Sequence, residues 1–148
     1  MKTVKALLIS NFSHVNLGLL LIRLGVGFSM LIFHGYDKIS GGPETWEKVG
    51  ASMGNLGLDF APVFWGFMAA FAEFFGSIFL ILGILHRPAA AILAFTMLVA
   101  TVRHLSLPPE AAGAGWKGAS HALELLAVYA GLLAAGPGKY RLGRLTRN

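Results

Sequence analysis

Cysteine is absent from the 148 residues of the chain. Its absence excludes disulfide bonds, thiolate metal ligands and dithiol redox chemistry within these residues. Charged residues are also scarce, at 13% of the chain, whereas hydrophobic residues make up 55%. A water-soluble domain of this size needs far more polar surface, so the composition predicts that the chain lies in lipid rather than in water.

Long apolar segments account for most of the sequence. A helix needs about 20 apolar residues to cross a bilayer core about 30 Å thick. Four segments meet this need, the third by borrowing a turn from its flanks: residues 16–33, 62–85, 88–102 and 119–135. We therefore expect residues 1–148 to form a single transmembrane domain, an all-α four-helix bundle with a basic tail at 137–148.

The longest loop between these segments, residues 35–61, contains a second kind of helix signal. Pro43 followed by acidic residues is typical of a helix start. Apolar side chains then recur at helical spacing, at Trp46, Val49, Met53 and Leu56. This pattern predicts a short amphipathic helix on the membrane surface or over the bundle, serving as a simple loop closure or as a functional lid.

Basic residues are distributed unequally between the two ends of the predicted bundle. One end has seven: Lys2, Lys5, Arg87, Lys139, Arg141, Arg144 and Arg147. The other has four, diluted by acidic residues: Lys38, Lys48, Arg103 and Lys117. The positive-inside rule predicts a multi-pass protein of the cell membrane with both termini in the cytoplasm. The net charge of +5 is thus interpreted as a topology signal that predicts membrane lipid, not nucleic acid, as a partner.

Ionisable side chains inside the predicted helices are the main functional signal. A charged group at the centre of a spanning helix costs roughly 2.5–3.5 kcal/mol on insertion scales. Arg23, Glu73 and Glu124 lie within helices, and Arg103 lies near a helix end. Depth and charge balance predict one ion pair between Arg23 and Glu73, and a second between Arg103 and Glu124. A purely structural role, in which these pairs fix the helix register, is the alternative to a functional one.

Three histidines and a lysine extend this polar set towards the outer surface. His34 and Lys38 continue the helical face of Arg23, and His104 and His121 lie near the ends of the last two helices. Together they predict a cavity that opens outward. Such a cavity suits a quinone, because Arg or His can donate to a carbonyl while Glu or His handles the proton that accompanies reduction.

These considerations assign roles to eight residues. The predicted catalytic residues are Glu73, His34 and Glu124. The predicted ligand-binding residues are Arg23, Lys38, Arg103, His104 and His121. A metal site is the weaker interpretation. His121-x-x-Glu124 resembles half of a bundle metal site, but the motif occurs once and in reverse order, and two nearby arginines would oppose a cation.

Several short motifs occur in a fixed order along the chain. They are Arg23-Leu24-x-x-Gly27, His34-Gly35-x-x-Lys38, Glu73-x-x-Gly76, Leu80-x-x-Gly83, Glu124 and Gly136-Pro137-Gly138. The set resembles the DoxX family of small four-helix membrane proteins, from about Asn16 to Tyr140. The family pattern often has Ser and Asp after the last glycine motif, where this chain has Arg141 and Gly143, so shared partners of the tail are in doubt.

The resemblance implies a redox-linked membrane subunit, because the family includes a subunit linked to thiosulfate:quinone oxidoreductase. It does not imply thiosulfate as the substrate. We therefore expect a quinone-binding subunit with a soluble redox partner. One alternative is a non-catalytic anchor or assembly factor for a soluble oxidoreductase. Another is a small transporter or proton pathway, for which a homodimer could enlarge the path, although no repeat or broken helix pair is visible.

Overall fold

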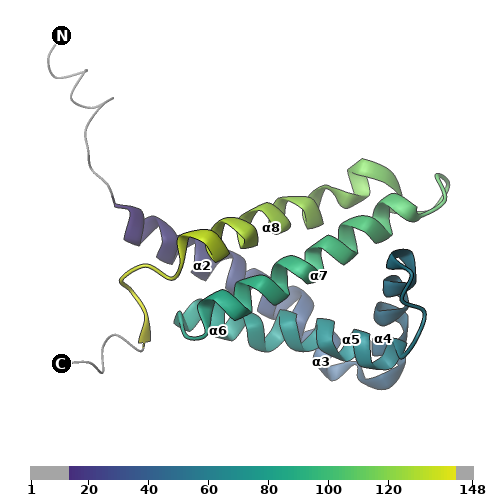
Figure 1. The fold of residues 1–148 in the computed structure, drawn as a ribbon, viewed down its shortest axis with the longest axis horizontal. Helices are drawn as coiled ribbons and strands as arrows, with labels where there is room; N and C mark the ends of the chain where they lie inside the picture. Colours follow the sequence, from purple (N-terminus) through teal and green to yellow (C-terminus); the bar gives the residue numbers. More distant parts are fainter. Residues whose placement is uncertain (1–13, 143–148) are drawn as a thin grey trace, which may run out of the picture.

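Four membrane-spanning helical segments make up most of the computed structural model, which describes residues 14–142 (Figure 1). The first segment comprises α2 (Val15–Met30), the π-helical turn η1 (Leu31–Gly35) and α3 (Tyr36–Ser40). The second comprises α5 (Pro62–Phe71), the π-helical turn η3 (Ala72–Gly76) and α6 (Ser77–Leu82). The third and fourth are α7 (His86–Ser106) and α8 (Gly115–Ala135). The predicted all-α membrane bundle is confirmed.

The helix bounds differ from the predicted ones mainly at polar residues. The first segment continues to Ser40 and the third to Ser106, past the expected ends at 33 and 102. Polar side chains there lower hydropathy, but they do not interrupt backbone hydrogen bonding, so the helices continue through them. The second segment ends early, at Leu82, because Gly83 adopts a left-handed conformation with φ of 72°. Such a glycine is a common helix terminator.

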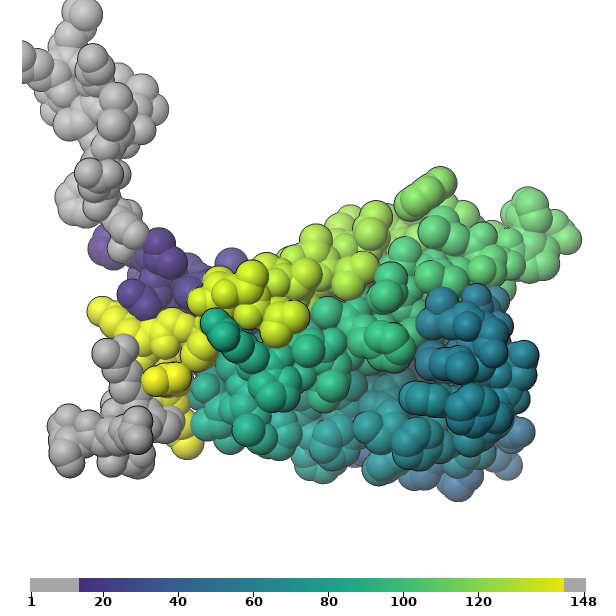
Figure 2. All heavy atoms as spheres, viewed as in Figure 1, coloured from purple at the N-terminus to yellow at the C-terminus, as the bar shows by residue number. Residues whose placement is uncertain are grey.

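The predicted amphipathic helix is also confirmed, as α4 (Gly42–Gly50) followed by a 3-10 helix, η2 (Ala51–Leu56). Two glycines let α4 lie close to α5. A Cβ atom on Gly66 would overlap the backbone of Trp46, and one on Gly50 would overlap the carbonyl of Pro62. In the space-filling view, residues 42–56 fill the space between α5 and the far end of α7 (Figure 2).

The core of the bundle lies where α7 and α8 pack along each other and meet the first two segments. Its buried side chains include Met30, Leu80, Leu93 and Tyr129. At one end, the backbone N–H of Lys139 donates to Asn16 Oδ1 at 2.8 Å. The two described ends of the chain therefore lie together, at the end of the bundle opposite α4 (Figure 1).

Candidate functional site: a polar cavity between the helices

Two π-helical turns face each other where the first and second segments cross. η1 packs against η3, and the closest approach is at Gly35. A Cβ atom there would lie 2.7 Å from the carbonyl oxygen of Glu73, so only glycine fits without a shift. Each turn inserts one residue into the helix, which rotates the residues that follow. Such turns are rare and are frequently found at functional sites.

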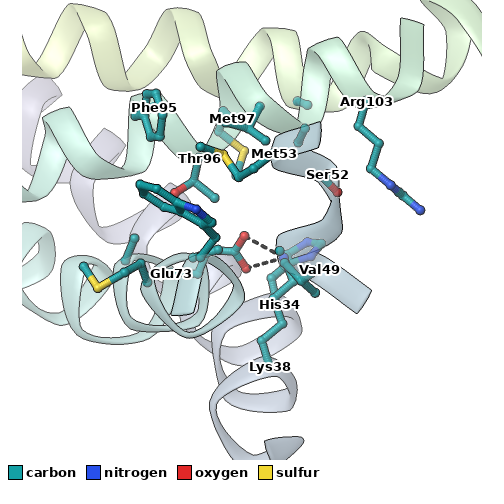
Figure 3. A pocket seen from close by; sticks show the side chains of 18 of the residues that line it. His34, Lys38, Val49, Ser52, Met53, Glu73, Phe95, Thr96, Met97 and Arg103 are labelled. Atoms are coloured by element: carbon teal, nitrogen blue, oxygen red, sulfur yellow. Dashed lines mark hydrogen bonds and ion pairs between the residues drawn. The ribbon is translucent and has the colours of Figure 1, made fainter. Parts of the chain in front are cut away.

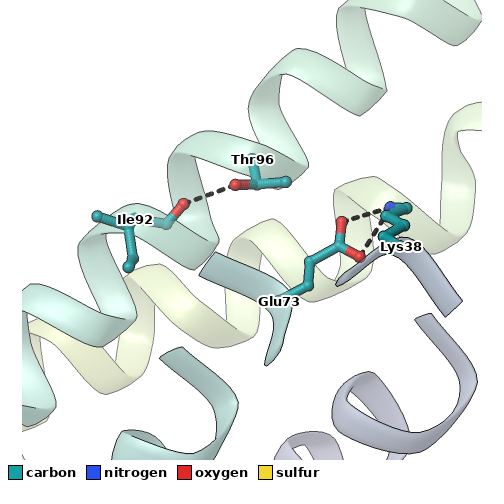
Figure 4. A network of polar contacts seen from close by, with 4 residues as sticks. All are labelled: Lys38, Glu73, Ile92 and Thr96. Carbon is teal, nitrogen blue, oxygen red and sulfur yellow. Dashed lines mark hydrogen bonds and ion pairs between the residues drawn. The ribbon is translucent and has the colours of Figure 1, made fainter. Parts of the chain in front are cut away.

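The two turns bring together an ion pair that is buried on one side. Lys38 Nζ donates to both carboxylate oxygens of Glu73, at 2.6 and 2.7 Å (Figure 4). The Glu73 side chain is 1% exposed and that of Lys38 is 29% exposed. Lys38 is further held by its own backbone, because Trp46 Nε1 donates to the Lys38 carbonyl at 2.8 Å. The helix α4 thus supports the residue that neutralises the buried carboxylate.

The predicted ion pair between Arg23 and Glu73 is wrong. Arg23 is 1% exposed, yet within the described residues its guanidinium donates hydrogen bonds only to backbone carbonyls, all at 2.7 Å. The acceptors are those of Leu80, Ile81, Pro137 and Tyr140. Carbonyls at the end of a helix lack partners within the helix and form the negative end of its dipole. Arg23 therefore joins α2 to the end of α6 and to the segment after α8, away from the cavity.

A cavity of about 670 Å³ opens beside the Lys38–Glu73 pair. Six of the predicted site residues line it: His34, Lys38, Glu73, Arg103, His104 and His121. Thr96 and Ala100, which share a face of α7 with Arg103, line it too. Much of the remaining wall is apolar, from Met30, Val49, Met53, Phe64, Met68, Phe95 and Met97 (Figure 3).

The cavity exists because α5 and α7 are held apart. α7 packs against α8, η3 and η2, but it has no extended contact with α5. Phe64 on α5 and Phe95 on α7 line the cavity and are also about half exposed, at 53% and 47%. In a membrane these exposed faces meet lipid, so the gap between α5 and α7 gives the cavity a lateral opening as well as a mouth near α4.

Two histidines contact each other at the cavity wall. The rings of His34 in η1 and His121 in α8 are stacked, with centroids 5.8 Å apart. His104 serves a different purpose, since its Nδ1 lies 2.7 Å from the Gly113 carbonyl oxygen and ties the end of α7 to the loop before α8. Of the three predicted histidines, His34 and His121 therefore meet at the cavity wall, whereas His104 contacts the loop before α8.

The predicted position of Glu124 in the cavity is also wrong. It lies exposed on α8 and does not line the cavity. Within residues 14–142 the predicted ion pair between Arg103 and Glu124 does not form. Residues three apart on a helix differ by about 60° in direction. Because His121 faces His34, Glu124 is turned away from the interior. In the described part of the chain, no group of three His, Asp or Glu side chains is placed to hold a metal ion.

Sequence reasoning missed several cavity residues, above all Lys48, Ser52 and Trp65. Lys48 and Ser52 lie one turn apart in the α4–η2 segment, so its inner face is partly polar. One signal for this wall is present in the sequence, namely the pattern of the short amphipathic helix itself. Trp65 resembled an interfacial anchor, and nothing in the sequence distinguished it from one.

These features define a class of multi-pass membrane protein: four spanning helical segments around a largely apolar cavity with a buried ion pair in its wall. The DoxX family model matches residues 18–105, which include five of the six cavity residues predicted from sequence. The chain belongs to the DoxX family. No curated protein and no solved structure matches it.

Proposed function

We propose that the cavity binds a quinone and that the protein acts as a redox-linked membrane subunit. The observation that supports this best is the Lys38–Glu73 ion pair, which lies in the wall of a largely apolar cavity open to lipid. A quinone has matching chemistry, because it joins two carbonyl oxygens to an apolar ring and an apolar tail. Ligand sites commonly combine an apolar pocket with a few polar groups that fix orientation.

The polar residues lie where they could hold one carbonyl. Lys38 Nζ has three hydrogens, so it could donate to a quinone oxygen while it keeps a bond to Glu73. His34 and His121 lie at the same wall and offer a second donor. The quinone ring would rest against Met30 and the methionines and phenylalanines of α5 and α7, with its tail leaving through the gap between those helices.

Reduction of a quinone to a quinol takes up two electrons and two protons. The carboxyl group of Glu73 and the imidazoles of His34 and His121 would exchange these protons with water at the mouth. The electrons would come from an oxidoreductase partner that supplies its own redox centre. Within this chain, the role of the residues is to bind, to orient and to move protons.

The charge distribution supports a cell-membrane location with both termini in the cytoplasm. Four of the seven residues behind this inference, Lys2, Lys5, Arg144 and Arg147, lie outside the described residues. Because the chain has no cysteine, single cysteines introduced at Ala112 and Lys139 would report topology cleanly. An impermeant maleimide should label Ala112→Cys in intact cells and Lys139→Cys only after lysis. Labelling in the opposite order would reverse the orientation.

Mass spectrometry of lipid extracts tests the function directly. Protein purified in mild detergent should retain quinone, and Glu73→Gln and Lys38→Met should lose it while staying folded. Glu124→Gln is the matched control, because it removes an acid on the exposed face of α8. Equal quinone in all four samples would show that the cavity is not the site. A stoichiometric oxidoreductase partner with no quinone in any sample would favour the anchor alternative.

A further inference from the structure

The wall of the cavity contains more positively charged side chains than are needed to neutralise Glu73. Three cationic side chains line the cavity, Lys38, Lys48 and Arg103, against one acidic side chain, Glu73. Lys38 is occupied by Glu73. Among residues 14–142 no acidic group pairs with Lys48 or Arg103, although Glu44 lies one helical turn before Lys48. Two cations at the mouth are therefore left for a ligand.

These two cations come from different elements that meet at one end of the spanning segments. Lys48 belongs to the short helix α4, and Arg103 lies one turn before the end of α7. In Figure 3, Arg103 extends beyond Ser52, away from the apolar interior. A group held between the two side chains would thus sit at the depth of lipid headgroups.

An apolar path leads inward from this point. Val99 and Phe95 follow Arg103 down one face of α7 at four-residue intervals, and both line the cavity. The path from Arg103 to Phe95 is about 12 Å long, at 1.5 Å per residue. Across the gap it faces Phe64 and Met68 of α5, which are exposed to lipid at 53% and 37%.

We propose that the mouth binds the anionic headgroup of a phospholipid through Lys48 and Arg103, with one acyl chain lying along Val99 and Phe95. Charge complementarity selects an acidic lipid over a neutral one, and the lateral gap lets its chain enter without leaving the bilayer. The headgroup contacts at this site, Lys48 and Arg103, differ from the residues that would hold the quinone carbonyl, but the acyl chain and the quinone would share the apolar wall at Phe95 and the gap between α5 and α7. Its test does not depend on the quinone proposal, because the retained lipid is measured directly.

The test compares lipid retained by the protein after reconstitution into phosphatidylcholine vesicles that contain a minority of phosphatidylglycerol. Native mass spectrometry should find phosphatidylglycerol enriched on the wild type. At the usual contribution of a cation near an anionic lipid, Lys48→Gln or Arg103→Gln should reduce the enrichment about 5-fold and the double variant about 30-fold.

Two controls keep the result specific. Lys117→Gln removes an exposed cation from the first turn of α8 at the same end of the bundle, outside the cavity lining, and should keep the enrichment. The swap Lys48→Arg with Arg103→Lys preserves both charges and should also keep it. Unchanged enrichment in the double glutamine variant, or no enrichment on the wild type, would overturn the proposal. So would displacement of the lipid by inorganic phosphate at equal concentration, because the site would then take a free oxyanion.

Discussion

The membrane segments contain two buried charged side chains, Arg23 and Glu73, and their surroundings differ. At the end near the chain termini, Arg23 is enclosed by four backbone carbonyls and, among residues 14–142, forms no ion pair with a carboxylate. Beside the cavity, Glu73 is neutralised by Lys38, whose ammonium remains partly exposed. The first arrangement uses up nearly all the donors of its charged group. The second leaves hydrogens on Lys38 and an open space next to them.

This contrast separates a structural charge from a site that can bind. A buried guanidinium with every neighbour satisfied holds elements together but has little capacity for a ligand. An ion pair that faces a cavity can exchange one of its bonds for a bond to a ligand. Both groups are intramembrane charges, and the usual presumption that such charges are functional fits the second better than the first.

The largest effect should come from removing the enclosed arginine. Arg23→Ala would strip hydrogen bonds from four carbonyls at once, each costing about 1–3 kcal/mol when left unmet in a buried place. Some of them would gain water at the bundle end, so we expect a net destabilisation of about 3–5 kcal/mol. Thermal unfolding in detergent measures it. The stability of Arg23→Lys should fall between that of the wild type and that of Arg23→Ala, because an ammonium cannot reach all four acceptors.

The next effect should come from breaking the ion pair on one side. Lys38→Met would leave the buried carboxylate of Glu73 without its partner, at about 2–3 kcal/mol, less than for a fully buried pair because Lys38 is partly exposed. The double variant Lys38→Met with Glu73→Leu removes both charges and should recover most of that stability, while quinone retention stays lost. Recovery of binding together with stability would show that the pair has no ligand role.

The sequence predicts the features of these two regions that depend on local composition, but not those that depend on contacts between helices. Hydropathy alone found four spanning segments, because the cost of lipid exposure is set by composition over about 20 residues. It also placed Arg23 and Glu73 inside helices correctly. It could not find their partners, since Lys38 resembled a surface residue and the acceptors of Arg23 are carbonyls that every residue possesses.

The facing π-helical turns were equally invisible in the sequence. Their register depends on the contact between the first and second segments, which is a tertiary property. One local signal was present in hindsight: Gly35 follows His34 directly, and a glycine at a tight helix crossing permits close approach. Depth and charge balance do not predict the exposed position of Glu124, because they do not specify which face of α8 meets the cavity.

A smaller effect should follow from a methyl group at that crossing. Gly35→Ala would push its Cβ atom into the backbone of Glu73 and Phe74 and so separate η1 from η3. We expect about 1–2 kcal/mol of destabilisation from the overpacking, with a loss of quinone retention larger than the stability change alone explains. Gly25→Ala is the control, because nothing lies within 4 Å of the Cβ atom it would add. Equal stability and equal quinone retention in the two variants would show that the close crossing of η1 and η3 is not needed for either property.

The smallest effect should come from Glu124, which the sequence placed in the site and the structure places outside it. Glu124→Gln removes a charge that has no ion-pair partner among residues 14–142 and does not line the cavity. A change on an exposed face away from such features normally alters stability by less than about 0.5 kcal/mol. Unfolding temperature and quinone retention should therefore both match the wild type. Loss of quinone from this variant alone would return Glu124 to the site, and would require α8 to rotate by about 60° relative to its present packing.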